Sequence, residues 1–104
     1  MNKEISLKEF QKKIDVWIEH HGGYWPPLSM LSAIVEEIGE LAKEINHLEG
    51  FKPKKSDRKS SNLGEELADV MFAIICLANS YKIDINSELE DVIEKYTIRG
   101  SKRF

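Results

Sequence analysis

Two acidic clusters lie within segments whose apolar residues repeat at helical spacing. The first contains Glu36, Glu37 and Glu40, and the second contains Glu66 and Asp69. Residues three apart share one face of a helix, so Glu37 pairs with Glu40, and Glu66 with Asp69. Four carboxylates on neighbouring helices repel one another strongly unless a cation lies between them. Because oxygen ligands suit hard divalent ions, the clusters predict a site for Mg²⁺, with Mn²⁺ able to substitute.

The second cluster is the more informative because of its apolar surroundings. Residues 70–78 are all apolar, and a helical projection places both Glu66 and Asp69 next to Ala73. Carboxylates do not normally lie on such a face without a partner. For the first cluster and Glu44, a solvated helix face is an alternative interpretation. Taken together, the two clusters favour a metal-dependent enzyme that acts on a phosphate ester or anhydride.

The first half of the chain predicts two helices. Ser6 and Glu9 have the Ser-x-x-Glu pattern of a capping box, and the apolar periodicity that follows ends at about His20. A second apolar stripe predicts a helix from about Leu28 to Leu48, stopped by the glycine at position 50.

The second half predicts two more helices. Asn62 followed by Glu65 favours a capped start for a helix over about 63–81, which is apolar on nearly every side towards its C-terminal end. Ser87 with Glu90 predicts the cap of a fourth helix. Four helices with short connections predict an all-α four-helix bundle that forms one domain over residues 1–104.

The composition narrows the kinds of partner that the chain can have. With 104 residues the core is small, so we expect homo-oligomerisation to complete it. A formal net charge of −3 argues against a nucleic-acid partner. The apolar run at 70–78 is far shorter than the roughly 20 residues that span a membrane. The single cysteine, Cys76, lies in that run and is expected to be a core residue, and we expect a reduced, cytoplasmic setting.

Basic and aromatic residues are candidates for nucleotide contacts. The chain has neither a GxxxxGK[ST] nor a GxGxxG loop, so a phosphate group would need basic side chains and the metal. Lys95 and Arg99 lie four apart on one helical face, whereas a solvated surface charge is the simpler interpretation of any single lysine. Trp25 is a candidate base-stacking residue, and Trp17 fits the apolar stripe of the first helix and is expected in the core. The basic loop at 52–61 adds further cationic candidates, Lys54, Lys55, Arg58 and Lys59.

The histidines suggest a different metal chemistry, which the sequence disfavours. Glu44 and His47 have the Glu-x-x-His spacing of di-iron bundles, but such centres need two pairs of this kind. The chain has one such pair, and no histidine stands in register with Glu66 or Asp69. We therefore expect His47 to be exposed or to cap its helix.

Glu36-Glu37-x-x-Glu40, followed after residues 41–65 by Glu66-x-x-Asp69, resembles the EExxE…ExxD signature of the MazG-like nucleotide pyrophosphohydrolases. These enzymes belong to the all-α NTP pyrophosphatase superfamily. The resemblance implies hydrolysis of a nucleoside triphosphate between its α and β phosphates, giving a monophosphate and pyrophosphate.

The resemblance also implies roles for individual residues. Glu37, Glu40, Glu66 and Asp69 match the family's Mg²⁺ ligands, and Glu36 matches the glutamate that orients or deprotonates the attacking water. Lys95 and Arg99 match its phosphate-binding pair, and the family forms dimers or tetramers built from dimers. Cys76 and Arg99 stand where some relatives have asparagine, so base preference stays open.

Three hypotheses follow. The first is an Mg²⁺-dependent pyrophosphohydrolase of (d)NTPs that clears surplus or abnormal nucleotides. The alternative is a catalytically silent helical module that binds a nucleotide or a partner protein around a structural metal site. A third is a different phosphohydrolase reaction at the same metal site. The complete set of four acids favours the first hypothesis over the second.

Overall fold

A computed structural model describes residues 4–50 and 62–100, which contain four helices and no strand. The prediction of an all-α fold is therefore confirmed. The helices are α1 (Leu7–Glu19), α2 (Pro27–Leu48), α3 (Leu63–Ser80) and α4 (Ile85–Arg99).

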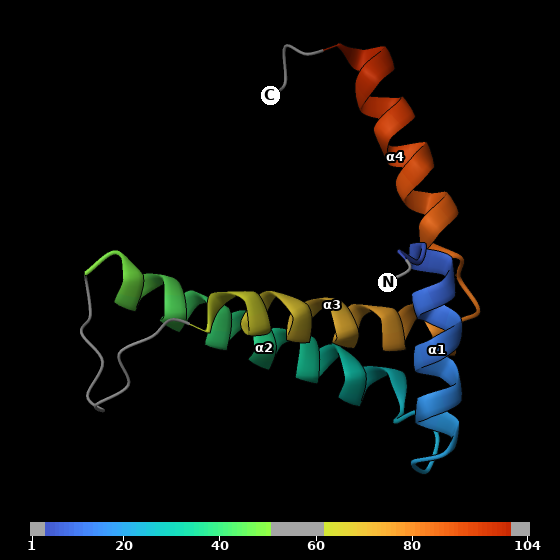
Figure 1. Cartoon of the computed structure of the whole chain (residues 1–104), viewed down its shortest axis with the longest axis horizontal. Coiled ribbons are helices and arrows are strands. Elements are labelled where there is room, and N and C mark those ends of the chain that lie inside the picture. The colour runs from blue at the N-terminus through green and yellow to red at the C-terminus, as the bar shows by residue number, and fades with distance from the viewer. Residues whose placement is uncertain (1–3, 51–61, 101–104) are drawn as a thin grey trace.

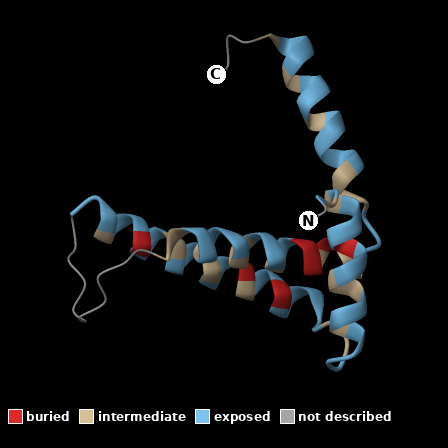
Figure 2. Ribbon diagram, in the orientation of Figure 1, coloured by how far each residue is buried: buried red, intermediate tan, exposed pale blue. Residues whose placement is uncertain are grey.

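The centre of the fold is an antiparallel pair formed by α2 and α3, and α1 crosses one end of this pair (Figure 1). The buried apolar residues cluster towards that crossing (Figure 2). Burial of Cys76 confirms its predicted place in the core. The core is formed by Met30, Ile34, Ile75, Cys76 and Ala78.

Local sequence signals set the ends of α1 and α2. The Ser6 hydroxyl accepts a hydrogen bond from the Glu9 amide at 3.1 Å, and the Glu9 carboxylate accepts one from the Ser6 amide at 2.9 Å, which confirms the capping box. Pro27 occupies the first turn of α2, where its missing amide hydrogen costs no helical bond. Gly50 follows the end of α2 with φ of 79°, a conformation that favours glycine.

The predicted start of α3 after Asn62 is confirmed, but the expected side-chain cap is absent, and the predicted cap of α4 is wrong. The Asn62 side chain makes no capping hydrogen bond, and its backbone amide instead donates to Glu44 Oε2 at 3.1 Å. The cap of α4 is Asp84, whose Oδ1 accepts from the Ser87 amide at 3.2 Å, so the helix begins before Ser87. The hydrogen bonds from Ser87 lower the pKa of Asp84, and the Lys8 ammonium lowers it further.

A buried polar network fastens the α3–α4 connection to α1. Gln11 is 7% exposed, and its Nε2 donates to Asn79 Oδ1 and to the Ile83 carbonyl, both at 2.9 Å. Gln11 Oε1 accepts from the Ile85 amide at 3.0 Å, and Asn79 Nδ2 donates to the Gln11 carbonyl at 3.0 Å. These bonds fix where α4 begins.

From that point α4 extends away from α2 and α3 (Figure 1), and none of its residues is buried (Figure 2). Its apolar side chains Leu89, Ile93 and Ile98 are exposed, as are Val35 on α2 and Met71 on α3. The chain alone therefore leaves much of its predicted apolar stripe uncovered, and completion of the core by a second copy stays a prediction. No helix in the described part of the chain is long and apolar enough to cross a membrane.

Candidate metal site and adjoining pocket

Packing of α2 against α3 brings three of the predicted acids together. Carboxylate oxygens of Glu37, Glu66 and Asp69 lie within 4.8 Å of one another. Glu37 comes from α2, and the other two lie one turn apart on α3. The juxtaposition follows from the three-residue spacing within α3 and from the antiparallel contact between the helices.

Among the three acids, the environment of Glu66 gives the strongest reason to expect a bound cation. Its Oε2 is buried and has no hydrogen-bond partner. Burial raises the pKa of Glu66, and the negative charges of Asp69, Glu40 and Glu37 raise it further. An orphaned carboxylate oxygen facing other carboxylates is costly unless a positive ion compensates it. The all-oxygen donor set fits a hard divalent ion such as Mg²⁺ or Mn²⁺.

Glu40 and Glu36 lie outside this group of three. Glu40 is close enough to raise the pKa of Glu66, but it is exposed and pairs with Lys43 Nζ at 3.9 Å. A surface pair of this length is weak, so a bound ion could draw Glu40 away from it. Glu36 is exposed on α2. Their predicted roles as metal ligand and water-activating base stay predictions.

A cavity of about 480 Å³ adjoins the acids. It lies among the C-terminal end of α1, the connection that follows it, α2 and α3. Glu37 and Asp69 form part of its wall, so the cavity and the acid group share two residues. Aromatic and apolar side chains form most of the remaining wall, including Trp17, His21, Tyr24, Trp25, Met30, Phe72 and Cys76.

Three of the ring side chains that line the cavity contact one another. The rings of Trp17 and His21 are parallel, with centroids 3.9 Å apart, and Phe72 meets Trp17 edge-on at 6.0 Å. The prediction that Trp17 lies in the core is wrong, because its side chain faces the cavity and is 51% exposed. Trp25 lines the cavity and is 65% exposed, which leaves its indole ring available to stack on a planar group.

Sequence reasoning missed His21 and Phe72 as cavity residues. His21 lies beyond the last residue of α1, so helical periodicity gave no signal for it. Phe72 comes from α3, and its part in the cavity depends on how α1 crosses that helix.

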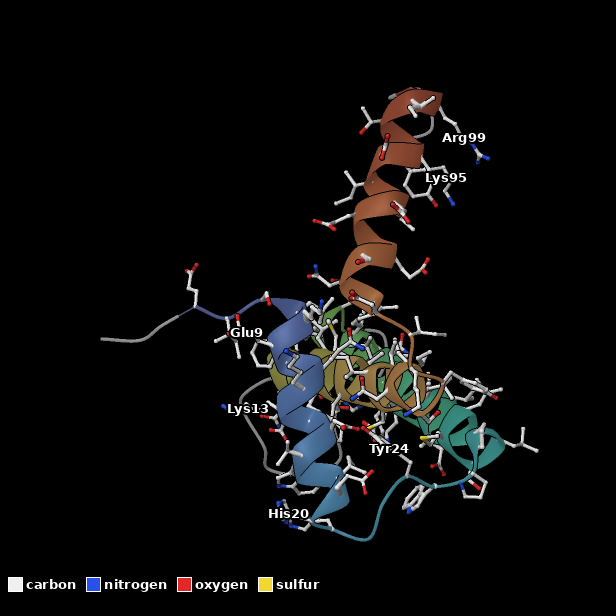
Figure 3. All side chains as sticks on the ribbon, turned by 90° about the vertical axis from the view of Figure 1, so that its right-hand side faces the viewer. Glu9, Lys13, His20, Tyr24, Lys95 and Arg99 are labelled. Carbon is white, nitrogen blue, oxygen red and sulfur yellow. The ribbon has the colours of Figure 1, made fainter. Side chains whose placement is uncertain are left out.

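Tyr24 ties the wall of the cavity to α1. Its hydroxyl donates to Asp15 Oδ1 at 2.6 Å. Burial raises the pKa of Tyr24 far above its ordinary value, and the hydrogen bond to Asp15 adds to the rise. Tyr24 is therefore a fixed, neutral donor to Asp15 at physiological pH, and it holds the connection between α1 and α2 in place (Figure 3).

The structure does not bring the predicted phosphate-binding residues to the acids within one chain. Lys95 and Arg99 lie near the far end of α4, beside Asp91, Glu94 and Ile98 (Figure 3). Because α4 points away from α2 and α3 (Figure 1), these two cations lie apart from the group formed by Glu37, Glu66 and Asp69. The cationic candidates Lys54, Lys55, Arg58 and Lys59 lie outside the described residues.

The side chains of Glu44 and His47 are less exposed than predicted. Glu44 is buried, not solvated, and accepts from the Asn62 amide at the start of α3. His47 is half-buried and its Nδ1 is buried without a hydrogen-bond partner, so the expectation of an exposed or capping histidine is wrong. Glu44 departs from expectation because the residue that precedes α3 contacts this part of α2.

Solved structures with this fold place the chain in a class of enzymes. A crystal structure of YpjD from Bacillus subtilis superimposes with a TM-score of 0.82 at 38% identity, covering 91% of this chain and 98% of the other. The crystal structure of a Bacillus-conserved MazG protein, a nucleotide pyrophosphohydrolase, gives a TM-score of 0.77 at 36% identity, covering 91% and 92% of the two chains. The fold is therefore that of the all-α nucleotide pyrophosphohydrolases.

Sequence comparison gives the family. Residues 26–104 match the model of the MazG nucleotide pyrophosphohydrolase domain. YpjD of Bacillus subtilis (strain 168) is 38% identical over 100 residues, covering 95% of this chain and 90% of that protein. YvdC of the same organism is 31% identical over 104 residues, covering 94% and 89%. The chain belongs to the MazG family of nucleotide pyrophosphohydrolases, which are generally metal-dependent hydrolases.

Proposed function

We propose that this protein hydrolyses nucleoside triphosphates to the monophosphate and pyrophosphate with Mg²⁺. The observation that carries the proposal is that the acid group and the aromatic cavity adjoin each other. Glu37 and Asp69 belong both to the acid group and to the wall of the aromatic cavity. A nucleotide with its base in the cavity would have its phosphates beside the carboxylates, where a divalent ion neutralises their charge.

Each acid has a proposed role. Glu37, Glu40, Glu66 and Asp69 would hold Mg²⁺, which when bound polarises phosphoryl oxygens and lowers the pKa of a coordinated water. Glu36 would orient the attacking water or take its proton, and Glu37 would contribute to catalysis from within the cluster. The indole of Trp25 would stack on the base, a contact that any base can make.

A second copy of the chain would complete the site. Phosphate groups need positive side chains, and α4 carries Lys95 and Arg99 away from the acids of its own chain (Figure 3). The exposed apolar residues of α2, α3 and α4 would provide the interface for a dimer, or for a tetramer built from dimers. In such an assembly the α4 helix of one copy would bring its cations to the acids of another.

The biological setting that fits these features is clearance of surplus or abnormal nucleotides in the cytoplasm. The cavity wall offers stacking surfaces more than hydrogen-bonding groups, which suits a range of bases. The formal net charge of −3 disfavours nucleic acid as a partner, and we propose no membrane partner.

Turnover of a panel of NTPs and dNTPs tests the proposal. We expect hydrolysis with Mg²⁺ that is lost in EDTA and falls about 1000-fold in Asp69→Asn, equivalent to several kcal/mol of transition-state stabilisation. Glu90→Gln removes an exposed acid of α4 and serves as the matched control. Absence of turnover, with retained nucleotide binding, would instead support the catalytically silent binding module.

A further inference from the structure

We propose that His21 selects bases that carry an exocyclic amino group, such as cytosine and adenine, over their keto counterparts uracil and hypoxanthine. The inference rests on the proposed function, because it places the base of a nucleotide in the aromatic cavity. It depends on one atom, His21 Nε2, and on which tautomer the imidazole ring adopts.

The hydrogen bond at the other ring nitrogen fixes the tautomer. His21 Nδ1 lies 2.6 Å from the carbonyl oxygen of Trp17. A carbonyl oxygen has no proton to give, so Nδ1 must carry the hydrogen and donate. In the neutral imidazole Nε2 then has a lone pair and is a hydrogen-bond acceptor. The stacking of the ring on Trp17 at 3.9 Å holds its orientation as well.

The other polar groups of the cavity do not offer an equivalent acceptor. The indoles of Trp17 and Trp25 are donors only. The Tyr24 hydroxyl donates to Asp15 and is also hydrogen-bonded by the Asn79 side chain, and the Cys76 thiol is a weak acceptor whose pKa burial raises. Glu37 and Asp69 are assigned to the metal. His21 is exposed and lines the cavity, and among the described residues none is seen to donate a hydrogen bond to its Nε2, so this lone pair is open to solvent or to a ligand.

An acceptor in this position distinguishes amino from keto bases. The 4-amino group of cytosine and the 6-amino group of adenine donate a hydrogen bond to such a nitrogen. Uracil and hypoxanthine have a carbonyl oxygen at the same place, which would face the lone pair of Nε2 without a hydrogen between them. Loss of one hydrogen bond of ordinary strength corresponds to a preference of about 10-fold.

The test compares dCTP with dUTP, and ATP with ITP, as pairs that differ at one position of the base. We would measure KM and kcat for wild type, His21→Phe and His20→Phe at about pH 8, where ordinary imidazoles are neutral. His21→Phe keeps an aromatic ring to stack on Trp17 but has no acceptor. His20 is exposed and is not part of the cavity wall, so His20→Phe is the matched control.

We expect wild type and His20→Phe to prefer the amino member of each pair by about 10-fold through KM, and His21→Phe to lose the preference. His21→Ala also lacks the acceptor and should lose the preference too. This second variant supplies the test if His21→Phe does not fold. No amino preference in wild type, or a preference that survives in either His21 variant, overturns the inference.

A binding measurement separates failure of this inference from failure of the proposed function. The α,β-imido analogues of dCTP and dUTP, which resist cleavage between these phosphates, can be titrated against tryptophan fluorescence. If no nucleotide is hydrolysed, the proposed function fails, and about 10-fold tighter binding of the dCTP analogue still supports the role of His21. Equal affinity for the two analogues contradicts it.

Discussion

Gln11 offers the sharpest test of how the fold positions α4. Its side chain makes three hydrogen bonds, to Asn79 Oδ1, to the Ile83 carbonyl and from the Ile85 amide. In Gln11→Ala these three partners lose their hydrogen bonds in a buried region. Each partner left unsatisfied costs about 1 kcal/mol or more, and water compensates part of this, so we expect a loss of roughly 2–4 kcal/mol in the free energy of unfolding.

The assay is denaturant and thermal unfolding at one fixed protein concentration, since oligomerisation couples stability to concentration. For a domain of this size the loss corresponds to a fall of about 10–20 °C in Tm. Gln11→Met keeps a similar volume without hydrogen bonds and should show most of the loss, which separates it from a cavity effect. Lys13→Ala, on the exposed side of α1 (Figure 3), is the control. A loss below about 0.5 kcal/mol, or one equal to that of Lys13→Ala, would refute the reasoning.

Three further predictions concern the site. Because the pKa of Glu66 is raised, its favourable contribution in metal-free protein is present below the ordinary value of 4.5 and is lost as pH rises through the raised value. In EDTA, Glu66→Gln should therefore be less destabilised than wild type on going from about pH 5 to about pH 7.5; parallel Tm shifts would contradict the shifted pKa. In EDTA, Asp69→Asn should have a Tm equal to or above that of wild type, whereas Mg²⁺ should raise the Tm of wild type only. An equal rise in Tm for both proteins would show that Asp69 does not bind the metal. Trp25→Ala should raise KM about 5- to 150-fold with little change in kcat, as expected for a lost stacking contact of about 1–3 kcal/mol; an unchanged KM would exclude stacking on Trp25.

The sequence was sufficient for the features that depend on local spacing. The Ser6 and Glu9 capping box acts within one turn, and the boundaries of α2 follow from an apolar stripe between a proline and a glycine. The grouping of Glu66 with Asp69 follows from their separation by three residues. Pairing of this group with Glu37 needed only the expectation that two amphipathic helices pack together.

The features that sequence reasoning missed depend on contacts between distant segments. Glu44 is buried, and it accepts a hydrogen bond from the amide of Asn62, which lies 18 residues further along the chain. Trp17 fits an apolar stripe, yet the crossing of α1 over α3 turns it towards a cavity beside Phe72. Such contacts between distant segments cannot be read from periodicity, which reports only which face of a helix is apolar.

The position of α4 also could not be predicted from its own sequence. Lys95 and Arg99 share a helical face as expected, but the Gln11 network directs the helix away from the acids of the same chain (Figure 3). The spacing of the two cations thus predicts that they share a helical face, but it does not predict which acidic or phosphate group they contact.

The proposed function requires that water hydrolyses the bond between the α and β phosphates of a nucleoside triphosphate. The most direct measurement is ³¹P NMR of dCTP turned over with Mg²⁺ in ¹⁸O-labelled water. We predict dCMP and pyrophosphate as products, and the isotope shift will report whether the α or the β phosphorus is attacked. Formation of dCDP with inorganic phosphate would show that another bond is cleaved and would contradict the proposed function.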